Sequence, residues 1–285
     1  MLRKAALLPV LAVAIGIGAC DSSTSPRTGQ LTVLLTDAPG DYLESATVEI
    51  GRIEVIGVDG TRTTVTEDGG TFNLLDLQDG VTAHLGTVQV DPGLYRELRM
   101  IVKHASVTLL EGYEFQSGGR TMDIHVPSGA ASGIKIGLAY ADGEQGAGVE
   151  IRPGETILVV DFDVGGNFVM QGSPERPSGI KGFNFTPRLR AVVRDVAGSI
   201  SGTVAPLGLL TDTLTATATR QGAPTEEAPA TASVAEDGTF MIRFLAPGTY
   251  DVTLTRLADG ETANSVEVSV DESEAETGVE LTITP

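Results

Sequence analysis

The chain has 285 residues and a formal net charge of −19, because 38 acidic residues outnumber 19 lysines and arginines. A surface of this sign repels phosphate backbones, so the composition excludes nucleic acid as a partner. The 35 glycines and 14 prolines, together with many valines and threonines, are typical of strands and turns rather than helices. The single cysteine excludes an intramolecular disulfide, so the fold must be held by its hydrophobic cores.

An apolar segment opens the chain. Arg3 and Lys4 are followed by about a dozen apolar residues from Ala5 to Ile17. This length is too short for a helix across a ~30 Å hydrocarbon core, but it suits the central region of a signal peptide. The sequence therefore predicts that residues 1–19 are a signal peptide and that the mature chain works outside the cytoplasm.

The single cysteine, Cys20, directly follows Ile17-Gly18-Ala19, and this tetrapeptide resembles a bacterial lipobox. The resemblance implies cleavage before Cys20 and acylation of its thiol, which would anchor the mature chain in a membrane through a tether at 20–29. The alternative is an ordinary secretory signal followed by an unrelated thiol. The choice between inner and outer membrane is left open.

The stretch 30–196 is predicted to be one β-sandwich domain. Apolar residues alternate through Ala46, Val48 and Ile50, but the next apolar position is Ile53. The phase therefore slips by one residue between Ile50 and Ile53. Such a slip predicts a β-bulge, because an extra residue in one strand restores the inward direction of the side chains that follow.

A second alternating row contains two carboxylates. Val160, Phe162 and Val164 are predicted to face inward, so Asp161 and Asp163 project from the other face of the same strand, roughly 7 Å apart. We expect this to be a solvated outer face. Weak binding of a hard cation such as calcium is the alternative, because carboxylates are its preferred ligands.

The candidates for catalysis are few. Ser132 and Lys135 have the Ser-x-x-Lys spacing of penicillin-recognising enzymes, but the glycine-rich surroundings indicate a loop rather than the helix start that this chemistry needs. His84, His104 and His125 are scattered without metal-ligand spacing. We therefore expect no enzymatic activity, no metal and no cofactor.

Five short segments of this domain, in order along the chain, resemble a bacterial domain-of-unknown-function family found on surface lipoproteins. The family has no assigned activity, and the resemblance implies only a location outside the cytoplasm. The segments are Leu34-Leu-Thr-Asp-Ala-Pro39, Asn73-Leu-Leu-Asp-Leu-Gln-Asp-Gly80, Pro127-Ser-Gly129 with Gly133-Ile-Lys135, Asp161-Phe-Asp-Val164, and Pro187-Arg-Leu-Arg190.

The remaining stretch, 197–285, is more acidic per residue, which favours a domain boundary near Ala197. Tyr250, Val252 and Leu254 alternate with polar residues, as in a strand with one buried face. The segments 198–204, 237–240 and 247–250 resemble the carboxypeptidase-regulatory-like module. That resemblance implies a compact prealbumin-like antiparallel β-sandwich, of a kind classed with starch-binding-like folds.

The same resemblance raises carbohydrate binding as an alternative function. Sugar sites stack a ring on an exposed aromatic side chain, and tryptophan is absent from this chain. Tyr113 and Tyr140, which lie near glycine-rich loops, are the candidate platforms. Packing in the core or at a strand edge is the competing role for both.

The two predicted domains share a pattern. Gly70-Thr71-Phe72 and Pro92-Gly93-Leu94-Tyr95 are echoed by Gly238-Thr239-Phe240 and Pro247-Gly248-Thr249-Tyr250, with a longer insertion in the first copy. We interpret both domains as prealbumin-like sandwiches, the first elaborated by a loop or short helix. Chance is the competing interpretation, because turns followed by tyrosine are common in β proteins.

Together these features predict an all-β protein of two tandem antiparallel β-sandwich domains behind a cleaved signal peptide. We expect a non-catalytic protein anchored in the bacterial cell envelope through Cys20, acting in surface display, adhesion or interaction. Its partner would be an envelope protein or a glycan. A carbohydrate-binding lipoprotein is the alternative.

Overall fold

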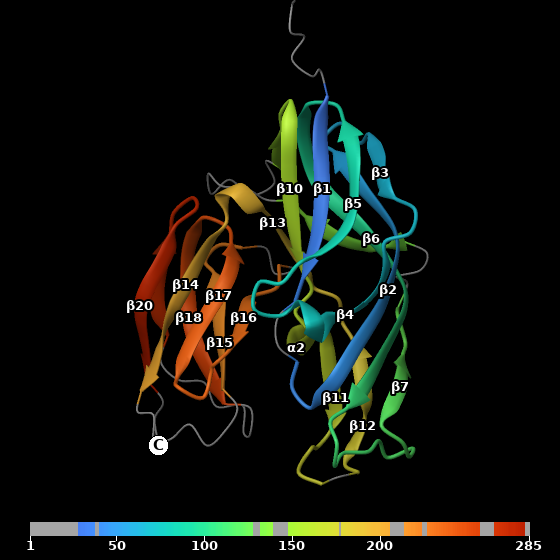
Figure 1. The fold of residues 1–285 in the computed structure, drawn as a ribbon, viewed down its shortest axis with the longest axis vertical. Coiled ribbons are helices and arrows are strands. Elements are labelled where there is room, and N and C mark those ends of the chain that lie inside the picture. The colour runs from blue at the N-terminus through green and yellow to red at the C-terminus, as the bar shows by residue number, and fades with distance from the viewer. Residues whose placement is uncertain are drawn as a thin grey trace, which may run out of the picture.

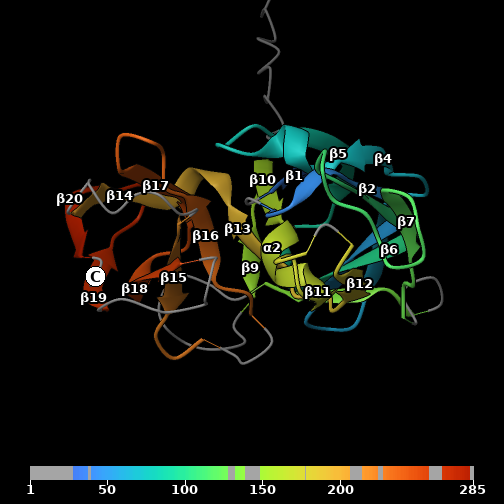
Figure 2. The same cartoon turned by 90° about the horizontal axis from the view of Figure 1, so that it is seen from below.

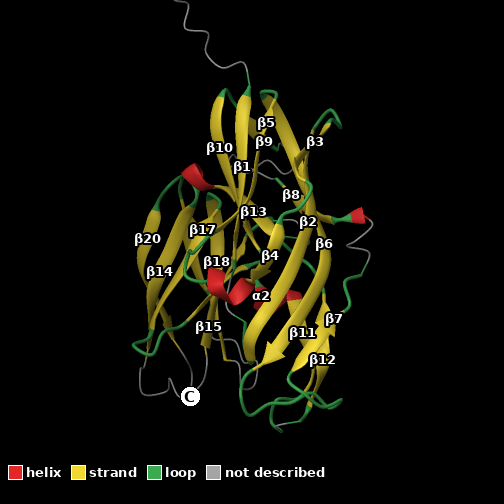
Figure 3. Cartoon of the chain, turned by 45° about the vertical axis from the view of Figure 1, so that its right-hand side comes forward, coloured by secondary structure: helices red, strands yellow, loops and turns green. Residues whose placement is uncertain are grey.

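The computed structural model describes residues 28–37, 40–127, 132–138, 148–176, 178–205, 214–223, 227–256 and 265–282. Nearly all of the secondary structure in them is strand, which confirms the predicted all-β class (Figure 3). The predicted signal peptide, Cys20 and Tyr140 lie outside the described residues. Two separate hydrophobic cores are present; the first extends from Leu31 to Val193 and the second begins at Ile200.

The first core lies between two sheets. One sheet has the order β13-β10-β1-β5, formed by Arg190–Val193, Gly154–Asp161, Gly29–Thr36 and Ala83–Val90. The other has the order β3-β2-β6-β7, formed by Arg62–Thr66, Leu43–Gly57, Gly93–Leu109 and Thr121–Ile124. Three short strands extend it: β4 (Gly70–Asn73) pairs with β2, and β8 (Ile134–Gly137) and β9 (Val149–Ile151) pair with β6.

A hairpin and three short helices complete the first sandwich. The hairpin consists of β11 (Phe168–Gly172) and β12 (Ile180–Phe185), and the helices are η1 (Leu74–Leu77), α2 (Val164–Asn167) and η2 (Arg194–Val196). Phe162, Phe168 and Phe185 stack beside α2 with ring centroids 5.2–6.2 Å apart. Stacked aromatic rings bury a large apolar area, so they fix the position of this short helix.

The second core also lies between two sheets. One has the order β17-β14-β20, formed by Thr239–Leu245, Gly198–Ala205 and Ala275–Thr282. The other has the order β16-β15-β18-β19, formed by Ala230–Ser233, Leu214–Arg220, Gly248–Arg256 and Val266–Val270. The two sandwiches lie side by side, the first in blue to yellow and the second in orange to red (Figures 1 and 2).

Both sandwiches have the same topology. In the first, β1 pairs with β5 antiparallel and with β10 parallel; in the second, β14 pairs with β17 antiparallel and with β20 parallel. The facing sheets correspond as well, since β3-β2-β6 matches β16-β15-β18. The parallel pairs depart from a purely antiparallel arrangement. They arise because a late strand in each sandwich returns to lie alongside the first one in the same direction.

The two Pro-Gly turns occupy equivalent places in this topology. Gly93 begins β6 after β5, and Gly248 begins β18 after β17, so each turn carries the chain from one sheet to the other. The tyrosine two residues later makes the same contact in both copies. Tyr95 Oη donates to the Asp91 carbonyl at 2.8 Å, and Tyr250 Oη donates to the Ala246 carbonyl at 2.6 Å.

The other half of the repeated pattern is not equivalent. Phe72 lies on β4, which pairs with β2, whereas Phe240 lies on β17, which pairs with β14. The counterpart of β17 is β5, so β4 and η1 belong to the insertion in the first copy. The predicted bulge is confirmed, because the β2–β6 register passes from Ile50 opposite Val102 to Ile53 opposite Met100.

Candidate functional site at the junction of the two sandwiches

A buried arginine joins the two sandwiches. Arg190, the first residue of β13, forms an ion pair with Asp161, the last residue of β10, and donates hydrogen bonds to the carbonyls of Arg243 and Phe244 in the second sandwich. The Arg190 and Asp161 side chains are only 10 % and 7 % exposed. Charge-assisted hydrogen bonds are strong in such a desolvated place, so this contact fixes the two sandwiches to each other.

Asp163 makes a second contact across the same junction. Its Oδ1 accepts hydrogen bonds from Thr231 Oγ1 of the second sandwich and from the Gly166 amide of α2, both at 3.2 Å. The backbone of Asp163 is left-handed (φ 48°), and so is that of Phe244 (φ 52°). Left-handed backbone is unfavourable for a bulky residue such as phenylalanine, so both sides of the junction hold strained conformations that the surrounding contacts must maintain.

The predicted outer face for Asp161 and Asp163 is wrong. The two residues are only 5 % and 3 % exposed. The strand ends at Asp161, and Asp163 caps α2 instead of continuing the strand. Arg190 contacts Asp161 and Thr231 contacts Asp163, so these two side chains are covered rather than solvated. The burial predicted for Val160, Phe162 and Val164 is confirmed, although only Val160 lies on the strand.

Four of the five segments that carry the family resemblance meet at this junction. The Val164 amide donates to Asp37 Oδ1 at 2.9 Å, and the Asp37 amide donates to the Leu77 carbonyl at 3.1 Å. With the Arg190–Asp161 ion pair, these contacts connect segments that lie up to about 150 residues apart in the chain. We call the set Asp37, Asp161, Asp163, Arg190 and Thr231 the polar joint.

The polar joint predicts an unusual pH dependence of stability. Burial, and then the neighbouring charge of Asp161, raise the pKa of Asp163 to about 6 from its ordinary value of 3.8. Between pH 4 and 6 the folded state therefore binds more protons than the unfolded state, so the free energy of unfolding falls as the pH rises. At roughly 1.4 kcal/mol per pKa unit, the raised pKa of Asp163 lowers the free energy of unfolding by about 3 kcal/mol above pH 6.

Replacing Asp163 by asparagine tests this. Asp163→Asn keeps an oxygen that can accept from Thr231 and Gly166, so we expect it to stabilise the fold at pH 7. We also expect the free energy of unfolding to fall less between pH 4 and 6 than in the wild type. The measurement is urea unfolding at half-unit pH steps. The control is Asp195→Asn, because the Asp195 side chain is 70 % exposed and should leave the profile unchanged. An unaltered slope in Asp163→Asn would contradict the assignment.

Of the two candidate sugar platforms, the structure describes Tyr113. Its ring is half-buried, packs against the first core and lies edge-to-face with Tyr42, with centroids 5.5 Å apart and planes at 75°. Tyr42 has left-handed backbone (φ 62°), and its carbonyl accepts a hydrogen bond from the Leu110 amide. Tyr113 therefore packs against Tyr42 and the first core, and it is not part of the polar joint.

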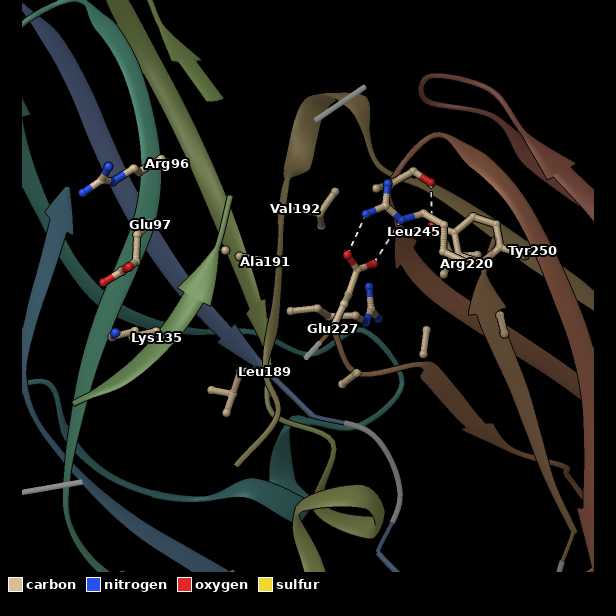
Figure 4. A pocket seen from close by; sticks show the side chains of 16 residues that line it. Arg96, Glu97, Lys135, Leu189, Ala191, Val192, Arg220, Glu227, Leu245 and Tyr250 are labelled. Atoms are coloured by element: carbon tan, nitrogen blue, oxygen red, sulfur yellow. Dashed lines mark hydrogen bonds and ion pairs between the residues drawn. The ribbon is translucent and has the colours of Figure 1, made fainter. Parts of the chain in front are cut away.

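A cleft of about 300 Å³ lies beside the polar joint, between the two sandwiches (Figure 4). The second sandwich contributes to it the ion pair between Arg220 of β15 and Glu227. Arg220 Nε donates to Glu227 Oε1 at 3.0 Å and Nη2 donates to Oε2 at 2.6 Å. Tyr250 also lines the cleft, with its hydroxyl donating to the Ala246 carbonyl. The other lining residues of the second sandwich are small or apolar, namely Ala218, Ala228, Ala230, Leu245 and Ala246. The sequence did not predict this cleft, because the cleft forms only when both sandwiches are in place.

The first sandwich forms the opposite wall of the cleft. Arg96, Glu97 and Lys135 line it, and in Figure 4 their charged ends point away from Arg220. Lys135 lies on the strand β8, so it is not one helical turn beyond Ser132 as serine-enzyme chemistry would require. Within the described ranges no group of three or more His, Cys, Asp or Glu side chains is arranged to hold a metal ion. None of the helices described is long and apolar enough to span a membrane.

Several solved structures are similar to this chain at very low identity. The Bacillus anthracis TIE protein is 11% identical, with a TM-score of 0.21, and 89% of this chain aligns to 34% of that one. This chain thus spans about a third of the length of that protein. BcpA, the major pilin subunit of Bacillus cereus, is 11% identical with a TM-score of 0.21, covering 90% of this chain and 100% of BcpA.

The shaft pilin SpaA from Lactobacillus rhamnosus GG gives similar values: 8% identity, a TM-score of 0.24, and coverage of 90% of this chain and 98% of the pilin. Similarities at this level carry no inference about activity.

No curated protein matches the chain. A family model does match it, over residues 28–187, and these residues contain β1 to β12 and most of the polar joint. The chain therefore belongs to the family described as "Domain of unknown function (DUF4382)".

Proposed function

We propose that this chain is a non-catalytic, lipid-anchored protein of the bacterial cell envelope that acts as a surface display or interaction module. The observation that carries this proposal is the polar joint. Because Arg190 binds Asp161 and two carbonyls of the second sandwich, the two sandwiches form one unit rather than two freely rotating domains. Loops at the ends of a rigid unit keep fixed relative positions, which suits recognition of a partner.

The proposal includes the domain limits predicted from the sequence. A signal peptide at 1–19 and a tether at 20–29 would precede a first domain at 30–196 and a second at 197–285. The tether would reach at most about 35 Å when fully extended, at roughly 3.5 Å per residue. The module would therefore work close to the membrane, outside the cytoplasm.

Metabolic labelling tests the anchor. Cells fed a clickable fatty-acid analogue should label the wild-type chain and leave Cys20→Ser unlabelled, because only an acylated thiol anchors the chain stably. The matched control is the double variant Cys20→Ser/Ser23→Cys, which restores a thiol outside the lipobox and should stay unlabelled. Labelling of Cys20→Ser, or retention of residues 1–19 in the mature chain, would refute the anchor.

Crosslinking in the native envelope tests the interaction. We expect an envelope protein to be recovered with the wild-type chain and lost when the joint is broken by Arg190→Met. The alternative, a carbohydrate-binding lipoprotein, predicts instead binding on a glycan array that is abolished by Tyr113→Ala or Tyr140→Ala. Recovery of no partner together with an empty array would contradict both readings.

A further inference from the structure

We infer that the cleft between the two sandwiches binds a small neutral polyol, such as a single hexose residue. This goes beyond the proposed function, because it assigns a ligand site that depends neither on the lipid anchor nor on Tyr113. The cleft has a volume of about 300 Å³, which is at the lower end of the range for small-molecule sites.

The polar wall of the cleft is a fixed ion pair. The Arg220 and Glu227 side chains are 14% and 21% exposed, and two parallel hydrogen bonds hold them in one plane. Each carboxylate oxygen of Glu227 accepts one hydrogen bond from Arg220 and has capacity for a second. The pair therefore offers acceptors at a defined position, with the positive charge of a guanidinium directly beside them.

The charges around the cleft favour an uncharged ligand. Glu227 neutralises Arg220, and Asp161 neutralises Arg190, so neither pair presents a net charge to a ligand. The other charged lining residues, Arg96, Glu97 and Lys135, point away from Arg220 (Figure 4). Arg190, Arg220 and Glu227 line the cleft together with Tyr250. Burial, the largest effect, raises the pKa of Tyr250 to about 12, so this hydroxyl stays protonated and neutral. A charged ligand would have to displace Glu227 from Arg220, while a neutral one can bind the pair as it stands.

Hydroxyl groups fit this wall best. A hydroxyl donates and accepts at once, so neighbouring hydroxyls can donate to Glu227 while also accepting from a guanidinium. The small side chains Ala218, Ala228 and Ala230 leave room on the same side of the cleft, and Leu245 adds an apolar surface. The C–H face of a sugar ring can pack there while its hydroxyls reach the ion pair. Larger side chains at these alanines would close the space.

Ligand-observed NMR on the folded chain tests the site. Glucose, galactose and mannose serve as neutral probes, and glucuronate and glucosamine are their charged counterparts. We expect saturable binding of at least one neutral hexose, and at least tenfold weaker binding of the charged sugars. Glu227→Ala should weaken hexose binding at least tenfold, since it removes the charge-assisted acceptor. Ala228→Leu should do the same by filling the cleft without changing its charge.

Two controls keep the outcome specific. Glu150→Ala breaks the Arg152–Glu150 pair, which has the same Nη2–Oε2 distance of 2.6 Å but lies on the exposed surface, so hexose binding should be unchanged. Tyr113→Ala should also leave it unchanged. Absence of binding by all three hexoses, equal binding of glucuronate, or full binding by both Glu227→Ala and Ala228→Leu would overturn the assignment. None of these results affects fatty-acid labelling, so the lipid anchor is tested independently of the hexose site.

Discussion

Replacing Arg190 by methionine is expected to lower the free energy of unfolding by about 3–5 kcal/mol, the range for breaking a buried ion pair by removing one partner. Asp161 would remain at 5 % exposure without its counter-charge, and the carbonyls of Arg243 and Phe244 would lose their donor. Methionine fills a similar volume, so the loss would report charge and hydrogen bonding rather than a cavity. Urea unfolding at pH 7 measures it.

The matched control is Arg194→Met, four residues further along. Arg194 is paired with Asp195 at 3.5 Å, but the two side chains are 48% and 70% exposed. Exposed pairs contribute little, so the change should stay below about 1 kcal/mol. Arg190→Lys should recover only part of the stability, because an ammonium lacks the fork that reaches a carboxylate and two carbonyls together. A loss below 1 kcal/mol for Arg190→Met would contradict the role of the joint.

We also expect Arg190→Met to change how the two sandwiches are held relative to each other. If the joint holds the sandwiches together, each sandwich should keep its own core while their relative orientation becomes variable. Small-angle scattering should then show a larger radius of gyration, with circular dichroism unchanged at low denaturant. Unchanged scattering would mean that other contacts between the sandwiches suffice.

The fold could be predicted because burial alternates with a period of two along a strand. The slip between Ile50 and Ile53 specified a bulge, and the row Val160, Phe162, Val164 specified an inward face; both are local patterns. The equivalence of the two Pro-Gly turns was likewise visible in the chain. The predicted equivalence of Phe72 and Phe240 was wrong, because a three-residue pattern does not determine which strand its segment pairs with.

The candidate site could not be predicted in the same way. Asp161 is indistinguishable from an outer-face carboxylate until its partner, 29 residues later, is known to pair with the same strand. Alternation says which residues share a face, but not whether a second domain covers that face. A signal was nevertheless present: the segments that carried the family resemblance contain Asp37, Asp161, Asp163 and Arg190, and four of the segments meet at the joint.

Asn167 is the second position where a single change should be severe. It is fully buried at the end of α2, and its side-chain amide donates to the carbonyls of Phe162 and Arg188, while its Oδ1 accepts from the Arg188 amide. Asn167→Asp replaces both donors by an acceptor, so two carbonyls would face a carboxylate. Unpaired buried groups cost about 1–3 kcal/mol each, so we expect a loss of at least 3 kcal/mol at pH 7.

This loss should depend on pH in a way that identifies its cause. Protonating the new carboxyl below its folded-state pKa returns one donor, so the destabilisation of Asn167→Asp should shrink as the pH falls. The control is Asn184→Asp on the exposed face of β12, which should change stability by less than about 0.5 kcal/mol. Because Asn167 holds Arg188, two residues before Arg190, the variants Asn167→Asp and Arg190→Met should lose less together than the sum of their separate effects. Strict additivity would mean that the two positions stabilise the fold independently, and that Asn167 does not position the joint.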